Sequence, residues 1–154
     1  MSWSVIYFGS EEIKGKTLPQ IIFSNTSWFF WAVEEGVFNN KGRLAEEARE
    51  INYKARNIKI PQPQGKGKLL ASYFIHPHTH DLDHIVFTSE NIKKDIPFIV
   101  RDRIDLSVPF EINCYDKKGG EILIEAVKTL YFKDKSTTKT AFEDFFENKD
   151  NFIF

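Results

Sequence analysis

The sequence predicts a single α+β domain in which an antiparallel sheet, including a β-hairpin, packs against several short helices. Its 154 residues fall within the usual size of one domain and can bury a sizeable core. Segments with the period of an amphipathic helix occur together with short runs rich in β-branched and aromatic residues. Fifteen Phe, five Tyr and three Trp are many rings for this length, which indicates an aromatic core.

The first 60 residues are expected to begin with a strand and a short helix. Aromatic and β-branched residues at positions 3–8 favour a strand that ends at Gly9. Thr17 suits the N-cap of a helix because Pro19 then falls in the first turn, where a proline is tolerated.

Two further helices are expected in this N-terminal part. The first is capped at positions 25–27 and stopped by Gly36, and its Trp28 and Trp31 share a face that we assign to packing. The second runs from about Arg43 to Asn57, because apolar residues recur there every three or four positions.

Residues 61–68, with the sequence PQPQGKGK, are expected to form a loop. Two prolines and two glycines exclude a helix interior and a central strand. This loop would separate an N-terminal part, residues 1–60, from a sheet with C-terminal helices, residues 69–154. Both parts are expected to belong to one domain, since neither is large enough to favour independent folding.

The sheet is expected to start with a β-hairpin. Residues 69–75 and 84–88 are rich in aromatic and β-branched side chains, and they flank a polar connection whose tip lies near residues 77–83. Further strands are expected at residues 98–108 and 110–115 on the same criterion.

Two helices are expected to end the chain. The sequence KKGG at residues 117–120 favours a turn, and the apolar spacing after it predicts a helix to about Phe132. A last helix should follow Thr137 or Thr138, with phenylalanines along its apolar edge and an apolar segment at residues 152–154.

Cysteine content and hydropathy suggest a cytoplasmic protein. Cys114 is the only cysteine, so the chain cannot form an intramolecular disulfide, and no signal-peptide pattern opens it. No apolar stretch approaches the roughly 20 residues of a membrane span. We therefore expect no membrane partner.

Basic residues concentrate in the middle of the chain. Residues 41–68 hold eight Lys and Arg against three Glu, a net charge of +5, whereas residues 141–154 are acidic. On the third expected helix Arg49, Tyr53 and Arg56 follow at helical spacing, which is suited to contacting phosphates and stacking on a base, although a solvated helix face has the same pattern. The nucleic-acid contact set that we predict comprises Lys14, Lys16, Arg49, Tyr53, Arg56, Lys66 and Lys68.

All four histidines fall within residues 76–84, beside two aspartates. Imidazole and carboxylate ligands suit zinc or iron, and a hairpin can bring distant members of the segment together. The alternative is a polar hairpin tip without a metal. The candidate metal ligands are His76, His78, His80, Asp83 and His84.

The same segment is similar to the His-x-His-x-Asp-His motif of metallo-β-lactamase-type hydrolases. One extra residue stands before Asp83, and no histidine is left elsewhere in the chain for the further ligands of that fold. The resemblance would imply a metal-dependent hydrolase centred on His76 to His84.

The N-terminal segment contains Phe8-Gly9, then the Lys14-Gly15-Lys16 turn followed by Thr17-Leu18-Pro19, and then the pair Trp28 and Trp31. Through these motifs it resembles the exonuclease X-like C-terminal module over about residues 5–36. The spacing between Phe8-Gly9 and the lysine turn is longer than is usual in that family. The resemblance implies an accessory, DNA-associated role rather than a catalytic one.

Three hypotheses about function follow. The first is a small non-catalytic protein associated with nucleic acid. The second is a protein-binding module or inhibitor, encoded by a phage or mobile element, and the third is the metal-dependent hydrolase. The first needs no cofactor, whereas the third requires zinc or another transition metal.

Overall fold

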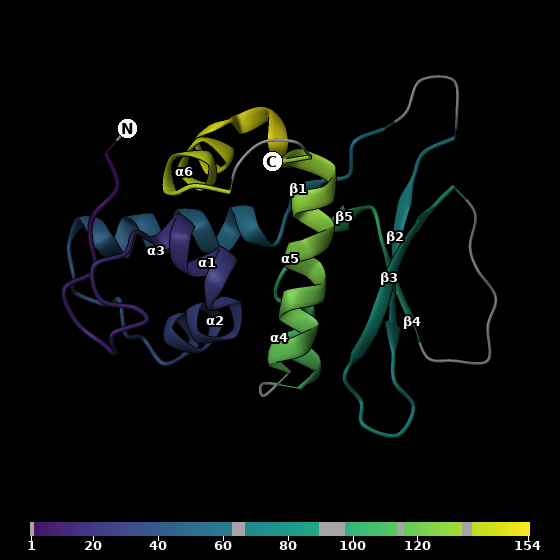
Figure 1. Ribbon diagram of the computed structural model, residues 1–154, viewed down its shortest axis with the longest axis horizontal. Coiled ribbons are helices and arrows are strands. Elements are labelled where there is room, and N and C mark those ends of the chain that lie inside the picture. The colour runs from purple at the N-terminus through teal and green to yellow at the C-terminus, as the bar shows by residue number, and fades with distance from the viewer. Residues whose placement is uncertain (1, 63–66, 90–97, 114–115, 134–136) are drawn as a thin grey trace.

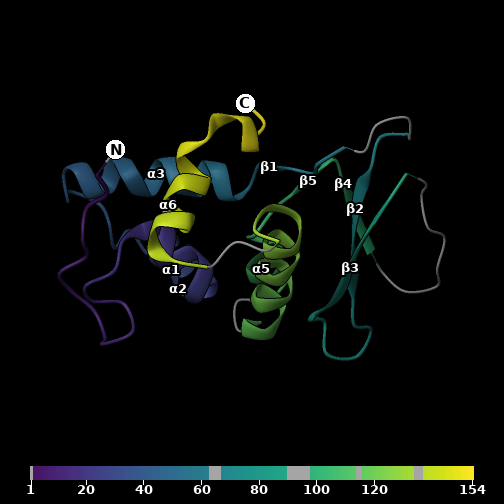
Figure 2. The same ribbon diagram turned by 45° about the horizontal axis from the view of Figure 1, so that its top comes forward.

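The computed structural model describes residues 2–62, 67–89, 98–113, 116–133 and 137–154. Helices α1, α2, α3 and α6 gather at one end of the molecule, and a three-stranded sheet lies at the other (Figure 1). Helix α5 stands between them in both views, where it packs on α2 and on strand β3 (Figure 2). The α+β class predicted from the sequence is confirmed.

The three N-terminal helices are α1 (Leu18–Ser24), α2 (Thr26–Glu34) and α3 (Arg43–Ala55). Thr17 is the N-cap of α1, and its backbone N–H donates to the side chain of Gln20 at 3.0 Å, as in a capping box. These helices confirm the three that were predicted.

The predicted first strand is wrong. Residues 2–7 belong to no helix or strand. The backbone of Ile6 pairs locally with the turn that follows, donating to Lys16 O at 2.9 Å and accepting from Gly15 N at 2.8 Å. Ser4 donates from its backbone and its hydroxyl to Glu47 of α3. The segment is therefore held by a turn and a helix instead of a sheet, which β-propensity alone does not distinguish.

The sheet contains the predicted hairpin. Strands β2 (Leu70–Ile75), β3 (Leu82–Thr88) and β4 (Phe98–Arg101) run antiparallel in the order β3-β2-β4. A second sheet pairs β1 (Ile58–Lys59) with β5 (Arg103–Ile104). Ile58 also forms a bridge with Phe152, so the N-terminal and C-terminal parts of the chain meet at β1. Of the predicted loop at 61–68, residues 61, 62, 67 and 68 lie outside helices and strands, and 63–66 lie outside the described residues.

Two expectations in the C-terminal part are corrected. Helix α4 (Val108–Ile112) replaces the strand predicted from residue 110, because Pro109 starts a helical turn; residues 114–115 lie outside the described part. Residues 117–120, predicted to form a turn before the helix, are instead the first turn of helix α5 (Lys117–Tyr131), because Asp116 caps that helix through the backbone of Gly119.

The last helix, α6 (Lys139–Glu147), begins after the predicted cap Thr138, whose Oγ1 accepts from Ala141 N. A short 3-10 helix, η1 (Lys149–Asn151), then leads to Phe152, which is buried.

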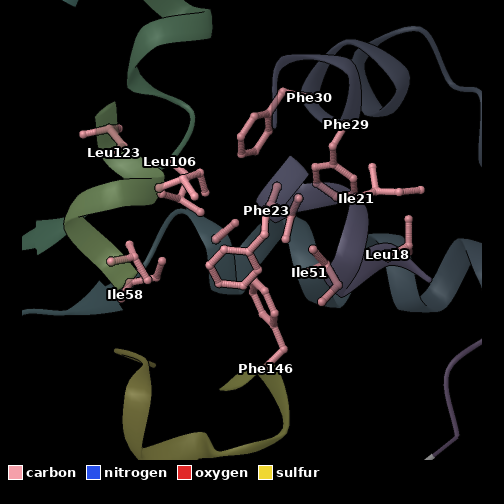
Figure 3. Close-up of a cluster of buried hydrophobic side chains, with 14 of the residues drawn as sticks. Leu18, Ile21, Phe23, Phe29, Phe30, Ile51, Ile58, Leu106, Leu123 and Phe146 are labelled. Atoms are coloured by element: carbon pink, nitrogen blue, oxygen red, sulfur yellow. The ribbon is translucent and has the colours of Figure 1, made fainter. Parts of the chain in front are cut away.

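The core is aromatic, as the composition predicts. Side chains from α1, α2, α3, α5 and α6 converge on one cluster (Figure 3). Phe23 stacks on Phe142 at 4.4 Å between ring centroids and also contacts Phe145 and Phe146. Trp31 is an exception, because 46% of its surface is exposed, so its assignment to packing was wrong.

Candidate functional site

The predicted nucleic-acid contact set does not form one surface. Lys14 and Lys16 belong to the N-terminal segment, which lies at the helical end of the molecule, whereas Lys68 precedes β2 at the sheet end (Figure 1). The Lys68 ammonium also lies 3.9 Å from Asp102. Lys66 lies outside the described residues.

Arg56 is partly buried, and its guanidinium is held by other side chains of the protein. Its guanidinium lies over the ring of Phe30, at 5.1 Å from the centroid, and donates to Ser107 Oγ at 2.9 Å and Glu111 Oε1 at 3.1 Å. These contacts tie the end of α3 to α4. The predicted phosphate contact at this residue is replaced by a structural role, which helical spacing cannot reveal because it does not show what packs against the helix.

Tyr53 is half covered by the C-terminal segment. Its hydroxyl donates to Ile153 O at 3.0 Å, and its ring stacks on Phe154 at 5.8 Å between centroids. The chain itself therefore occupies one face of the ring that was predicted to stack on a base. Arg49, one turn earlier, is exposed and forms no ion pair within the described part of the chain.

The histidines do not converge on a metal site. His76 Nδ1 accepts from the backbone N–H groups of His78 and Thr79 at 3.2 and 3.3 Å, and the ring of His84 stacks on Phe74 at 4.5 Å. Nowhere in the described residues do three His, Cys, Asp or Glu side chains lie close enough to share a metal ion. These contacts assign His76 and His84 to the hairpin itself.

The structure adds a surface that sequence reasoning missed, which we call the N-terminal aromatic surface. Ring contacts link its members in series: Tyr7 to Phe8 at 5.3 Å, Phe8 to Phe38 at 6.4 Å, Phe38 to Trp28 at 6.0 Å and Trp28 to Trp31 at 6.5 Å. At the ends of the series, Tyr7 is 68% exposed and Trp31 46% exposed, while Phe38 is buried.

Lysines border this surface. Lys41 Nζ lies 5.0 Å from the ring centroid of Phe8 and 5.9 Å from that of Tyr7. The backbone bonds between Ile6 and Gly15–Lys16 place the Lys14 to Lys16 turn alongside the residue before Tyr7. Lys14 and Lys16, two members of the predicted contact set, thus belong to a turn whose backbone pairs with the residue before Tyr7. The sequence signal was the spacing of Trp28 and Trp31, but spacing does not tell which ring lies at the edge of the core.

A cavity of about 420 Å³ lies between the junction of α1 and α2 and helix α5, which lines it from Lys117 to Lys128. Phe23, Ile124 and Trp28 contribute apolar walls. The charged lining residues are Glu12, Glu121, Glu125, Lys117 and Lys128. Three carboxylates against two ammonium groups repel a phosphate chain, so we do not place a polyanion in this cavity.

The shifted pKa values concentrate around β5. Tyr73 Oη accepts from Asp105 N and donates to Arg103 O, both at 2.8 Å, and burial raises the pKa of Tyr73. Burial also raises the pKa of Asp105, against the hydrogen bonds from Ser107 that lower it. The hydrogen bond from Arg103 lowers the pKa of Asp102. These bonds join β5 to its neighbours, so we assign the network to the fold.

No protein-family model matches this chain, and no curated protein or solved structure matches it either. The resemblance to the exonuclease X-like module therefore stays a prediction. None of the described helices is both long and apolar enough to cross a membrane.

Proposed function

We propose that this protein is a non-catalytic, accessory protein that binds single-stranded nucleic acid through its N-terminal aromatic surface. The observation that carries the proposal is a series of ring contacts with an exposed ring at each end, Tyr7 and Trp31, and with Lys41 Nζ 5.9 Å from the ring centroid of Tyr7. Proteins that bind single strands without sequence preference combine these same two features, because bases stack on rings while cations follow the backbone.

Magnitudes favour a single strand over a duplex. Stacking contributes about 1–3 kcal/mol per base. Two exposed rings would therefore supply a substantial part of the binding free energy that a micromolar dissociation constant represents. Bases in a duplex are already stacked on one another and offer nothing to these rings.

The test is a titration of labelled single-stranded DNA and RNA at low salt, read by fluorescence anisotropy and by quenching of tryptophan emission. We expect binding that weakens as salt rises, and a loss of at least tenfold in affinity on Tyr7→Ala or Trp31→Ala. Phe154→Ala is the matched control, because Phe154 is 73% exposed but lies on the C-terminal segment against Tyr53. If the protein binds neither single-stranded DNA nor single-stranded RNA at low salt, the proposal is overturned.

Lysine variants separate charge from stacking. Lys41→Gln should weaken binding and reduce the salt dependence, since one phosphate contact is lost. Lys59→Gln is its control, because Lys59 is an exposed lysine on β1, away from the aromatic surface. Equal effects of the two variants would show that the surface does not direct the phosphate contacts.

A second candidate is a protein-binding module or inhibitor, of the kind encoded by phages and mobile elements. Val5 is 54% exposed and lies two residues before Tyr7, so this part of the chain presents apolar area beyond the rings. Tyr and Trp are also the residues enriched at the centres of protein interfaces. Binding of a protein partner that depends on Trp31 and Val5, with no affinity for oligonucleotides, would favour this candidate.

A further inference from the structure

A small cavity of about 110 Å³ lies between α2 and α3, next to the N-terminal aromatic surface. Its apolar lining includes Phe38, Ala45 and Ala48, and its polar lining consists of Asn39, Arg49 and Asn52. Phe38 belongs to both features, since its buried ring also contacts Phe8 and Trp28. The cavity and the aromatic surface therefore share a wall.

The polar lining favours a ligand with acceptors and negative charge. No carboxylate lines this cavity, in contrast to the larger one beside α5. Arg49 is exposed and has no ion-pair partner among the residues described. Asn52 accepts from Arg56 Nε at 3.1 Å through its Oδ1, which leaves the amide nitrogen of Asn52 as the donor toward a ligand.

The size of the cavity limits the ligand further. Sites that enclose a whole small molecule measure about 300–1,000 Å³, so a volume of 110 Å³ suits one ring system of a longer ligand. A single strand has unstacked bases whose edges side chains can hydrogen-bond, and such a contact adds a preference for certain bases to binding that otherwise depends on stacking.

We propose that this cavity holds one unstacked base of the bound strand, with Asn39 and Asn52 at the edge of the base and Arg49 on the adjoining phosphate. The inference rests on the proposed function and adds the subsite that fixes the position of the strand. In this proposal Arg49 contacts the nucleic acid, whereas Tyr53 and Arg56, predicted with it, make contacts within the protein.

The test uses two variants of the full chain. Ala45→Leu fills the cavity from α3, and Ala45→Ser is its matched control because it leaves the volume almost unchanged. We expect Ala45→Leu to weaken binding of a single-stranded oligonucleotide at least tenfold and Ala45→Ser to change it less than twofold. Arg49→Gln should weaken binding several-fold and reduce the salt slope by about one phosphate contact, while Arg49→Lys retains most of the affinity.

Urea unfolding shows whether Ala45→Leu still folds. If it does not, the Arg49 variants still report on binding, because Arg49 is exposed. If Trp31→Ala weakens oligonucleotide binding but Ala45→Leu and Arg49→Gln do not, the subsite is wrong and the proposed function still stands. Absence of any oligonucleotide binding would overturn both. Loss of affinity in Ala45→Leu and Arg49→Gln, with the two conservative variants unaffected, is the result that supports the subsite.

Discussion

Asp116 and Gly119 form the N-terminal cap of α5, with the Asp116 Oδ1 accepting the backbone N–H of Gly119 at 2.7 Å. The second carboxylate oxygen accepts from Leu82 N at 2.8 Å, so one buried side chain joins the start of β3 to the start of α5. A Cβ atom at position 119 would lie 2.1 Å from Asp116 Oδ2. Glycine is required there by the close approach of the carboxylate.

This relationship predicts that Gly119→Ala destabilises the protein. Displacing Asp116 removes a cap and leaves buried N–H groups without their acceptor, which together cost about 2–4 kcal/mol. Gly120→Ala is the control, because a Cβ there meets Thr26 at 3.5 Å, an ordinary contact. It should stabilise the helix by up to about 1 kcal/mol. Urea unfolding measures both, and equal effects would contradict the role of the cap.

Burial of Asp105 predicts a pH dependence of stability. Its pKa is raised in the folded state above the ordinary value of about 3.9. In the pH window between these two pKa values, the folded protein therefore binds more protons than the unfolded chain does. The contribution of this group to the free energy of unfolding therefore falls as pH rises through the window and stays constant above it. In Asp105→Asn, whose Oδ1 still accepts from Ser107, this fall should disappear.

Unfolding midpoints of the wild type and Asp105→Asn across acidic and neutral pH measure the difference directly. Asp105→Ala, which lacks the acceptor for Ser107, should be less stable than the asparagine variant at every pH. Parallel pH profiles for the wild type and Asp105→Asn would show that the carboxyl is not the titrating group.

Arg56 is predicted to stabilise the fold instead of binding a ligand. Lysine at this position keeps the charge but loses the planar fork that contacts Ser107, Glu111 and the ring of Phe30, at a cost of about 1–3 kcal/mol. Arg49→Lys, on the exposed part of the same helix, should stay within about 0.5 kcal/mol of the wild type. Thermal and urea unfolding give the comparison, and an unaltered Arg56→Lys protein would refute the structural role.

The C-terminal segment provides a matched pair of phenylalanines. Phe152 is buried against Phe145 and Phe146, so Phe152→Ala should cost about 3–5 kcal/mol. Phe154 stacks on Tyr53 and is largely exposed, so Phe154→Ala should cost less than about 1 kcal/mol. A reversal of this order in urea unfolding would contradict the docking of the segment.

The histidine segment is predicted to stabilise the hairpin without a metal. A metal that binds the folded state raises the unfolding midpoint as its concentration rises. We expect excess zinc to leave the midpoint unchanged for protein that carries no histidine tag, and His78→Ala to match the wild type in this assay. A rise with zinc that His76→Ala abolishes would restore the metal-site hypothesis.

Local signals in the sequence were sufficient for most helices and for the β-hairpin. Thr17 and Thr138 cap the helices that follow them, because capping depends on residues three positions apart. The hairpin follows from two strand-like segments around a polar connection, and its register confirms that pairing. The aromatic composition also determined the character of the core.

Tertiary contacts decided the rest. The turn predicted at Gly119 became helix because Asp116, fixed by Leu82 from a distant strand, caps it. Arg56 binds Ser107 and Glu111, which lie far from it in the sequence. Trp31 contacts Trp28 but stays half exposed, whereas Phe38, which contacts Trp28 as well, is buried. Periodicity gives the direction of a side chain from its own helix, but which neighbour occupies that direction depends on residues far away in the chain. The sequence therefore determined that aromatic rings and lysines are present, whereas the fold decided which of them lie together at the surface.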